Sequence, residues 1–471
     1  MWTLLREIAS HAAHLNHKVY LVGGSLRDLL RGIMPTDLDL TVASGASVLA
    51  QRVAEQHRAT VVLLDEQRET LRVVLKDNLH LDFCLFKGTT LEEDLWARDF
   101  TINAMALPLQ ADQPEALVDL IDPTGGRQDL HYGLLRATNH RAMLDDPLRV
   151  LRGIRLAAQY HLTIIPETGV LLRQGTRRLA SIAGERIWQE LSKLLGNSGA
   201  YPWVELMDRD LRLWHQLLPG RLRMEETQQN YYHTENVWHH CLRTYRCLEV
   251  ILQELPLALA EGQAVLAALG QPLSGGNKNR LQVLKLASLL HDVGKPDTAV
   301  TQPSGRISFH GHSLAGLPYA HALADILKLS NPERDYLLHL VRYHMQPLHH
   351  YTARDHSDLA TYRLFRTLGY ASLDLLLLSL ADLTATLTAG ERLSELTPYR
   401  SFIHNLIRQY LARYRNWQPT KYLSGADLIK MGILAGPLVG EVLEKLAEAQ
   451  ITGTVKDLQT AQEWVKEHVT T

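Results

Sequence analysis

The sequence predicts an α/β head with a mixed sheet, followed by a long all-helical body. Three observations lead to this fold class. Val- and Leu-rich segments of strand length fall within about the first 135 residues, mixed with helical segments. From about residue 140 onward, apolar residues recur at spacings of three and four, as on helices. The chain has 471 residues, which is too many for one compact core.

The elements of the head follow in order along the chain. A helix is predicted first, from the apolar spacing in TLLREIASHAAHL. Five strands are then expected, in the segments KVYLV, DLDLTV, TVVLL, TLRVVLK and LHLDFCLF. The stretch LEEDLWARDFTINAMAL is predicted to be one helix, because its first turn is acidic and the helix dipole favours that. The helical region then begins with PLRVLRGIRLAAQY and ERIWQELSKLL.

Composition excludes several classes of protein. Hydrophobic residues make up 46% and charged residues 21%, as in ordinary globular proteins. The formal net charge of -2 means that any nucleic-acid surface must be local. The three cysteines form no C-x-x-C pair, which favours a reducing, cytoplasmic location. The charged N-terminus is unlike a secretory signal, and the run LDLLLLSLADL is too short and acidic to span a membrane.

Two glycines stand where an apolar strand meets a helix. Gly23 and Gly24 follow KVYLV and precede SLRDLLRG, with Gly32 placed to end that helix as a left-handed cap. A helix N-terminus offers free N–H groups, and glycines let a phosphate approach them closely. Arg27 lies one turn into the helix and can reach the same anion. Taken alone, the glycines more often indicate a plain strand-to-helix turn.

Two aspartates bracket one leucine in the next strand. Asp37 and Asp39 point to the same face, because strand residues two apart do so. Neighbouring carboxylates repel each other, and a divalent cation such as Mg²⁺ removes that repulsion. Alone, the pair also fits an edge strand with a solvated acidic face. A phosphate cradle a few residues upstream of the pair favours a metal site for phosphoryl chemistry.

These motifs resemble the class II tRNA nucleotidyltransferase and bacterial poly(A) polymerase family, whose head belongs to the polymerase β superfamily. GGSLRD followed by DLD carries the resemblance first. ARDFTINAMAL, LIDPTGGRQDL, DDPLRVLRGIRLAAQYHLTI and IAGERIWQEL follow in the family's order, so that the match covers roughly residues 18–195. The resemblance implies a polymerase β-like head, a helical neck and body, and template-independent transfer of nucleotides to tRNA.

The resemblance also assigns roles in the head. Asp37 and Asp39 are expected to hold catalytic Mg²⁺, and Asp82 is either a third carboxylate or a surface strand residue. Charged and amide groups on one helix are expected to contact the ribose and phosphates. The residues expected to bind the nucleotide's triphosphate and ribose are Gly23, Gly24, Arg27, Asp28, Arg98, Asp99 and Asn103.

The segment DDPLRVLRGIR is expected to read the base. Asp145 is predicted to cap the helix, with Pro147 in its first turn. Asp146, Arg149, Arg152 and Arg155 then lie three apart along one stripe. A carboxylate beside a guanidinium can pair with a base edge that carries an amine next to a ring acceptor. This arrangement accepts CTP or ATP and rejects GTP and UTP. The alternative is a surface ion pair three residues apart.

The helical body contains a second constellation of histidines and aspartates. The order H…HD…H…H…D, with LLHDVGK at its centre, resembles the HD phosphohydrolase superfamily. Such side chains bind Mg²⁺ or a transition metal, and a bound ion can activate water against a phosphate ester. Buried core histidines and a vestigial, RNA-binding domain are the alternatives. The expected ligands are His240, His291, Asp292 and Asp382, with His312, His344 and Lys295 as accessory groups.

We therefore expect four stretches: a nucleotidyltransferase head (1–138), a helical neck that reads RNA and base (139–225), an HD-type helical domain (226–390) and a helical tail (391–471). Only KGTT separates LHLDFCLF from LEEDLWARDF, where many complete CCA-adding members carry a longer loop. This resembles the CC-adding branch, with complete CCA addition as the alternative. The expected partners are the tRNA 3′ end, CTP and, in the alternative, ATP, with no membrane. The oligomeric state stays open.

Overall fold

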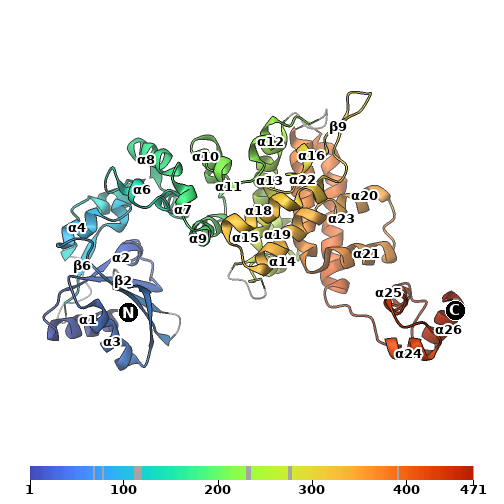
Figure 1. The fold of residues 1–471 in the computed structure, drawn as a ribbon, viewed down its shortest axis with the longest axis horizontal. Coiled ribbons are helices and arrows are strands. Elements are labelled where there is room, and N and C mark those ends of the chain that lie inside the picture. The colour runs from blue at the N-terminus through green and yellow to red at the C-terminus, as the bar shows by residue number, and fades with distance from the viewer. Residues whose placement is uncertain are drawn as a thin grey trace. The chain divides into compact units, whose positions relative to one another are not determined.

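The computed structural model describes residues 1–66, 69–76, 79–110, 119–229, 235–273, 278–389 and 392–469. The chain divides into two compact units. Unit 1 comprises residues 1–197 and 206–213, and unit 2 comprises residues 198–205 and 214–471. The expected mixed-sheet head and mostly helical remainder are confirmed (Figure 1). The finer division into four stretches stays a prediction.

Unit 1 begins with a six-stranded mixed sheet in the order β3-β4-β5-β2-β1-β6. Only β2 and β5 run parallel, and the other neighbours are antiparallel. The elements of the head are α1 (Trp2–His14), β1 (Val19–Val22), α2 (Gly23–Leu30), β2 (Asp37–Val42), α3 (Ala46–His57), β3 (Thr60–Asp65), β4 (Thr70–Val74), β5 (His80–Leu85), α4 (Leu91–Trp96), the 3-10 helix η2 (Thr101–Asn103) and β6 (Ala106–Pro108).

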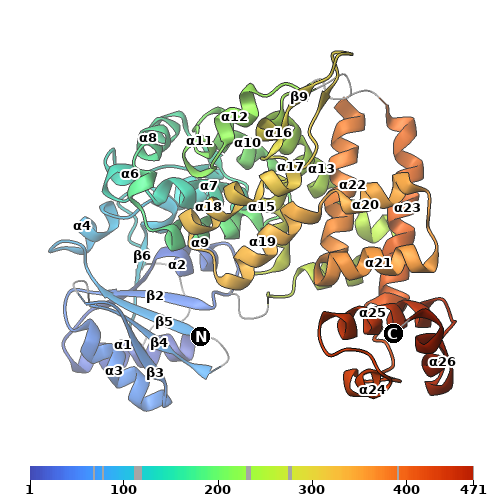
Figure 2. The same ribbon diagram turned by 45° about the vertical axis from the view of Figure 1, so that its right-hand side comes forward.

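Alternation along β2 decides which face of the sheet becomes core. Leu38, Leu40 and Val42 are buried on one face, where α1 and α3 complete the core, while Asp37 and Asp39 point to the other. Figure 2 shows α1 and α3 together beside the same side of the sheet. The catalytic-type residues therefore stand on the face opposite to the main hydrophobic core.

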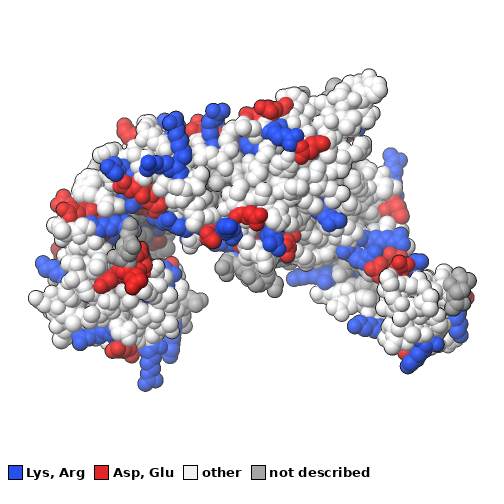
Figure 3. All heavy atoms as spheres, in the orientation of Figure 1, with Lys and Arg blue, Asp and Glu red and all other residues white. Residues whose placement is uncertain are grey.

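The rest of unit 1 is helical. Its elements are α5 (Gly126–His131), β7 (Leu134–Leu135), α6 (Ala142–Asp145), α7 (Arg149–Tyr160), β8 (Thr163–Ile164), α8 (Pro166–Thr176), the 3-10 helix η4 (Leu179–Ser181) and α9 (Gly184–Leu195). Helices α7 and α9 pack against each other through buried Leu, Ile and Trp side chains. Figure 3 shows Lys and Arg near α8 and α10, with Asp and Glu among them.

Unit 2 is built around α13 (Val237–Ala258) and α22 (Ser372–Ala389), which pack against each other. Its other helices are α11 (Trp214–Leu217), α12 (Arg221–Glu226), α14 (Gly262–Leu269), α15 (Arg280–Ser288), α16 (Lys295–Thr298), α17 (His312–Ala315), α18 (Leu317–Leu327), α19 (Asn331–Tyr343), α20 (Gln346–Ala353), α21 (Asp358–Leu368), η5 (Gly369–Ala371), η6 (Leu393–Glu395), α23 (Leu396–Gln409), the π-helix η7 (Tyr410–Tyr414), α24 (Gly425–Lys430), α25 (Pro437–Ile451) and α26 (Leu458–His468). A hairpin, β9 (Val300–Thr301) with β10 (Ile307–Ser308), interrupts them, and α10 (Tyr201–Arg209) contributes to both units.

One helical run in the described chain, Asp358–Ala389, is long and apolar enough to cross a membrane. Length alone therefore does not exclude a span, contrary to the sequence argument. However, 72% of its apolar window is buried within the protein, and α22 packs against both α13 and α23. This is the environment of a core helix.

Candidate active site

The first part of the site is the contact between α2 and β2. Asp39 Oδ2 accepts a hydrogen bond of 3.1 Å from the Gly24 N–H, and the Asp39 N–H donates to Ser25 Oγ at 3.1 Å. Gly23 has φ +70°, and a Cβ there would lie 2.6 Å from Asp39 Oδ2. Gly23 is thus required by the approach of a carboxylate, in addition to any role toward phosphate. Gly32 has φ +73°, as expected for a left-handed cap.

One further carboxylate and a histidine lie beside Asp39 and Asp37 on the neighbouring strand. In the parallel register Asp82 of β5 lies opposite Asp39, and His80 lies opposite Asp37. Arg72 of β4 donates two hydrogen bonds to Asp82, at 2.8 and 2.7 Å. His80 Nδ1 lies 2.8 Å from Asp37 Oδ1. The sequence analysis missed Arg72 and His80, although the alternation of TLRVV and LHLDF placed both on the face of the aspartates.

The carboxylates on this face of the sheet are of the type that binds a divalent cation. Burial raises the pKa of the half-buried Asp39, against the opposing charge of Arg98, and among the described residues no Lys, Arg or His forms an ion pair with it. A bound cation would lower the cost of holding this carboxylate charged. Hard oxygen ligands from two or three carboxylates suit Mg²⁺ better than a soft metal. Asp82 differs from the other two, because Arg72 already satisfies both of its oxygens.

Next to the carboxylates lies a group that can hold phosphates. Arg27 is buried, and its NH1 donates to Asn103 Oδ1 at 2.7 Å. It also donates to Asp28 at 3.0 and 3.1 Å and to the Tyr160 hydroxyl at 2.6 Å. The Asn103 amide in turn donates to Asp99 Oδ1 at 3.1 Å. Tyr160, at the end of α7, is a further contact that sequence reasoning missed.

The prediction of one helix through LEEDLWARDFTINAMAL is wrong. Helix α4 ends at Trp96, a single 3-10 turn covers Thr101–Asn103, and β6 begins at Ala106. The helix breaks here because Phe100 is completely buried and the Thr101 N–H donates to the Arg136 carbonyl. In a continuous helix, that N–H would instead donate to a carbonyl of the helix itself. Arg98, Asp99 and Asn103 are therefore not on one helix, although the turn still brings them to one site.

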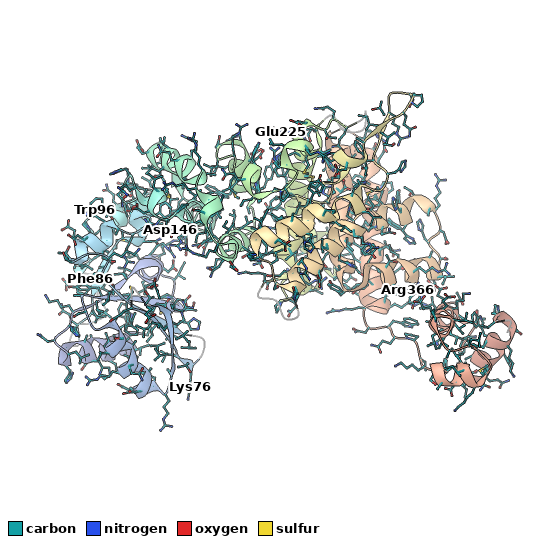
Figure 4. The ribbon with its side chains drawn as sticks, in the orientation of Figure 1. Lys76, Phe86, Trp96, Asp146, Glu225 and Arg366 are labelled. Carbon is teal, nitrogen blue, oxygen red and sulfur yellow. The ribbon has the colours of Figure 1, made fainter. Side chains whose placement is uncertain are left out.

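The prediction that Asp145 caps the base-reading helix is also wrong. Asp145 is the last residue of α6, and α7 begins only at Arg149. The N-cap of α7 is Leu148, and no described side chain caps this helix. The Asp146 carboxylate accepts from the Leu148 N–H at 3.2 Å, in the turn that leads into α7. The Pro147 ring lies in the connection before α7 rather than in its first turn. Figure 4 labels Asp146 between α6 and α7.

The four residues of the base-reading stripe have different environments. Arg149 is buried and donates to three backbone carbonyls, those of Ala97 at 2.8 Å, Arg98 at 3.1 Å and Ala142 at 3.2 Å. Asp146 accepts from Arg186 of α9 at 3.2 Å. Both members of the predicted pair are therefore fixed in place by the protein.

The other two arginines belong to an ion-pair network. Arg152 donates to Asp99 at 3.2 Å and to Glu190 at 3.3 Å, and Arg155 donates to Glu190 at 2.6 Å. Burial alone would raise the pKa of Asp99, but Arg152 and the Asn103 amide outweigh it and lower the pKa to about 2. Glu190, which closes the network from α9, was not predicted as a site residue.

Most of these groups line one cavity of about 670 Å³ within unit 1, although His80 and Tyr160 do not. Every residue predicted for the nucleotide and metal site of the head contributes to its wall. The cavity also includes Arg72, Lys87, Arg186, Glu190 and Lys193, which the sequence analysis did not single out. The arrangement places carboxylates for a metal, cations for phosphates and a fixed Asp–Arg pair for a base around one space.

Unit 2 brings the predicted histidines and aspartates together. Three overlapping groups can each hold an ion: His240 with His291 and Asp382, Cys241 with His291 and Asp292, and Asp292 with His312 and His344. His240 Nε2 lies 2.9 Å from Asp382, and Lys295 Nζ lies 2.6 Å from Asp292. Cys241 is a candidate ligand that was not predicted.

The donor chemistry of this cluster fits a divalent metal. Buried His291 Nε2 makes no hydrogen bond with a described residue, and it lies 3.3 Å from an Asp292 oxygen and 3.7 Å from an Asp382 oxygen. Burial and the neighbouring His291 and His312 lower the pKa of His344 to about 3, so this imidazole is neutral and able to ligate. The cluster opens to a cavity of about 830 Å³.

Three family models match parts of this chain. The poly(A) polymerase head domain matches residues 19–90 and 81–136, the probable RNA- and SrmB-binding site of polymerase A matches residues 161–223, and the HD domain matches residues 237–387. The A-adding tRNA nucleotidyltransferase of Deinococcus radiodurans is 32% identical over 458 residues, which cover 95% of this chain and 94% of that relative. The chain belongs to the tRNA nucleotidyltransferase family.

Two further comparisons place this tRNA nucleotidyltransferase. The CC-adding tRNA nucleotidyltransferase of Synechocystis is 29% identical over 472 residues, covering 98% of this chain and 97% of that one. The Thermotoga maritima CCA-adding enzyme, solved in complex with tRNA, has a TM-score of 0.65 and 23% identity, with coverage of 99% of this chain and 95% of that chain. The structural match supports the fold, and relatives with different named activities share it.

Proposed function

We propose that this tRNA nucleotidyltransferase adds two CMP residues from CTP to the 3′ end of tRNA in the cytoplasm. Membership of the family supports nucleotidyl transfer to tRNA. The observation that carries the choice of nucleotide is the Asp146–Arg149 pair in the wall of the carboxylate cavity. Three free cysteines, at positions 84, 241 and 247, fit the reducing location.

The contacts of Arg149 leave it suited to a base edge. A guanidinium has five N–H donors, and three are directed to backbone carbonyls. The two that remain match the ring nitrogen and carbonyl oxygen of cytosine, while Asp146 has lone pairs left to accept from the exocyclic amine. Uracil and guanine present the opposite pattern of donors and acceptors. With uracil or guanine, an N–H of the fixed Arg149 guanidinium would face an N–H of the base. Both donors would then lack an acceptor, which costs binding free energy.

The remaining roles follow from position. Asp37 and Asp39 hold the Mg²⁺ ions, which when bound supply charge stabilisation at the attacking and leaving oxygens. The N-terminus of α2, with Arg27 and Asn103, orients the triphosphate. The tRNA 3′ hydroxyl then attacks the α-phosphorus, the bond to the β-phosphate oxygen breaks, and pyrophosphate leaves. The protein contributes mainly positioning and electrostatics.

The restriction to CC rests on the connection between β5 and α4. Strand β5 ends at Leu85 and α4 begins at Leu91, so only five residues, 86–90, join them. Figure 4 labels Phe86, the first residue of this connection, and Trp96, the last residue of α4. Thr90 caps α4, and Glu93 accepts from the Thr89 and Thr90 N–H groups. A short, capped connection of this kind supports a site that does not rearrange to accept a second kind of base.

The test uses a tRNA transcript that lacks its terminal CCA. The protein is incubated with Mg²⁺ and labelled CTP, alone and with ATP, and products are sized at single-nucleotide resolution. Two added residues in both reactions support CC addition. A third residue that requires ATP would show complete CCA addition. Extension only of a transcript that already ends in CC, and only with ATP, would show A addition.

A matched substitution tests the metal assignment. Asp37→Ala is expected to abolish CMP incorporation while tRNA affinity stays within about twofold, because the carboxylate acts on the reacting phosphate. Asp65→Ala, at the end of β3, is the control. Retained transfer by Asp37→Ala would contradict the assignment.

We further propose phosphohydrolase activity for the HD cluster of unit 2. The overlapping ligand groups around Asp292 and the cavity lined by Lys295 and Arg306 support hydrolysis of a phosphate ester. Asp292→Ala is expected to remove this activity and to leave CMP transfer intact. Loss of CMP transfer in the same variant would contradict independent sites, and unchanged hydrolysis of model phosphate esters would contradict the cluster's role.

A further inference from the structure

The last residue of α7 contacts the arginine that is expected to hold phosphate. Tyr160 ends α7 because His161 follows it in the left-handed conformation, at φ +55°. The chain then turns away, and the Thr163 N–H donates to the Gly133 carbonyl at 2.7 Å. Tyr160 itself does not line the carboxylate cavity of unit 1. An effect of this side chain on the reaction must therefore pass through another group.

Tyr160 holds the Arg27 guanidinium by two contacts. Arg27 Nη2 donates to the Tyr160 hydroxyl at 2.6 Å, and the guanidinium carbon lies 4.3 Å from the centre of the tyrosine ring. An aromatic face attracts a guanidinium, and a hydrogen bond from a charged donor is stronger than one between neutral groups. Because Arg27 is only 6% exposed, water screens these contacts weakly. Together they fix the position and the orientation of the guanidinium.

The partners of Arg27 leave one of its N–H groups for a ligand. A guanidinium has five N–H donors. Nε and Nη2 donate to Asp28 at 3.0 and 3.1 Å, Nη2 donates also to Tyr160, and Nη1 donates to Asn103 at 2.7 Å. The second N–H of Nη1 has no partner among the residues that the structure describes. A Cβ at Gly24 would lie 3.6 Å from Nη1, so this donor stands beside the first turn of α2, where a phosphate is expected.

Helix α7 joins this phosphate group to the base-reading pair. Arg149 is the first residue of the helix and Tyr160 is its last, about 16 Å away along the helix axis. Arg149 is buried and donates to three backbone carbonyls, which fixes its end of the helix. Since α7 also packs against α9, it carries Tyr160 at a fixed place at the other end. Arg27 therefore takes its position from the same helix that positions the base reader.

We propose that Tyr160 is a positioning residue for nucleotidyl transfer, an inference that rests on the proposed function. It holds the Arg27 guanidinium so that the remaining N–H of Nη1 faces the triphosphate, while Arg149 at the other end of α7 holds the base. Tyr160 makes no contact with the substrate itself. Without its side chain the guanidinium has more orientations available, and ordering it again on binding lowers the affinity for the triphosphate. The pairing of the base with Asp146 and Arg149 is unaffected.

Two variants of the full-length protein separate the hydroxyl from the ring. Tyr160→Phe removes the hydrogen bond and keeps the ring, whereas Tyr160→Leu removes both contacts with Arg27. We expect the KM for CTP to rise about threefold in Tyr160→Phe and about tenfold in Tyr160→Leu, with the KM for tRNA within about twofold. Arg31→Leu is the control, because Arg31 lies 4.4 Å from the centre of the same ring but does not line the cavity. A rise in the KM for CTP in Arg31→Leu equal to that in Tyr160→Leu would overturn the proposal.

A double-mutant cycle tests whether Tyr160 acts through Arg27. In an Arg27→Ala background, Tyr160→Leu is expected to change the KM for CTP by less than about twofold, because the group that it positions is gone. Additive effects of the two substitutions would overturn the proposal. In Tyr160→Leu alone, the ratio of kcat/KM for CTP to that for UTP should stay within about twofold of wild type. A fall in this ratio would overturn the proposal too, since Tyr160 would then only keep α7 in place at Arg149.

Binding of magnesium pyrophosphate gives a readout that needs neither a base nor the reaction. In titration calorimetry, Tyr160→Leu is expected to raise the Kd for pyrophosphate about tenfold, and Tyr160→Phe, which keeps the ring and its packing, about threefold. Arg31→Leu should bind pyrophosphate like wild type. A Kd unchanged in both Tyr160 variants would overturn the proposal. Failure of the wild-type protein to extend the tRNA, with this pattern of pyrophosphate binding intact, would instead contradict the proposed function.

Discussion

Replacing Gly23 by alanine separates backbone strain from displacement of Asp39, the carboxylate proposed to hold a metal. Gly23 opens α2 at φ +70°, and its missing Cβ faces Asp39. An added Cβ would lie 2.6 Å from Oδ2, 3.2 Å from Cγ and 3.3 Å from Cβ of Asp39. The whole carboxylate side chain, and not one flexible atom, therefore stands in the way. Because Gly24 also donates to this carboxylate at 3.1 Å, the shift would weaken that bond as well.

The expected effect has two parts. An L-residue with a left-handed φ costs about 1 to 2 kcal/mol in the free energy of unfolding. Relieving the contact requires Asp39 to move by roughly 0.5 to 1 Å, and a misplacement of about 1 Å at a catalytic group costs about 100-fold in rate. We therefore expect Gly23→Ala to lose about 1 to 2 kcal/mol of stability and about 10- to 100-fold in the rate of CMP transfer.

Gly32→Ala is the matched control at the other end of the same helix. Gly32 has φ +73°, but a Cβ there meets nothing within 4 Å. It should show the same loss of stability, measured by urea denaturation, with transfer close to wild type. Single-turnover incorporation of CMP with excess enzyme isolates the chemical step. The reasoning is refuted if Gly23→Ala retains transfer within about threefold of Gly32→Ala.

Two further predictions concern buried charges. The pKa of Asp99 is lowered from an ordinary 3.8 to about 2. This shift corresponds to about 2 kcal/mol of folded-state stability. That stability is complete above pH 4 and is lost as the pH falls toward 2. Asp99→Asn should remove that stability at pH 7. Hydrogen exchange of the α7 amides measures the difference in stability between this variant and wild type, and that difference should become smaller below pH 4. In unit 2, Lys285 donates to Glu249 at 2.7 Å with both side chains buried. Lys285→Met leaves the Glu249 carboxylate charged without its cationic partner. It should lower the free energy of unfolding, measured by urea titration, by about 3 to 5 kcal/mol. An unchanged midpoint would contradict this.

The strands could be predicted from the sequence because their alternation is strong. Along DLDLTV, Leu38 and Leu40 lie on one face of the strand and Asp37 and Asp39 on the other, whatever the register. The acidic face could therefore be predicted without knowing which strands lie beside this one. The identity of those neighbours could not be predicted. Arg72 lies beside Asp82 only because β4 pairs with β5 in one particular register, and local periodicity does not determine which strands pair.

The wrong helix between α4 and β6 has a physical reason. Leu91 to Trp96 carries a capping box and a favourable first turn, so the prediction was correct for six residues. Beyond Trp96, local propensity no longer decides the structure. The buried Phe100 and the Thr101 hydroxyl, which donates to Asp129 at 2.7 Å, fix the chain by contacts with residues far along the sequence. A local pattern contains no information on such contacts.

The sequence treats three arginines alike, whereas the structure gives them different partners; they are Arg149, Arg152 and Arg155. The spacing of three made them equivalent as members of one stripe. In the structure, Arg149 is held by uncharged backbone carbonyls, whereas Arg152 and Arg155 donate to carboxylates. A guanidinium held by neutral carbonyls keeps its charge and two donors available to a base, while ion-paired guanidiniums have much of their charge compensated. Three residues of one type and one spacing thus divide into one held by neutral carbonyls and two held by carboxylates. The partners that divide them lie in residues 97–99, on α6 and on α9, outside the motif.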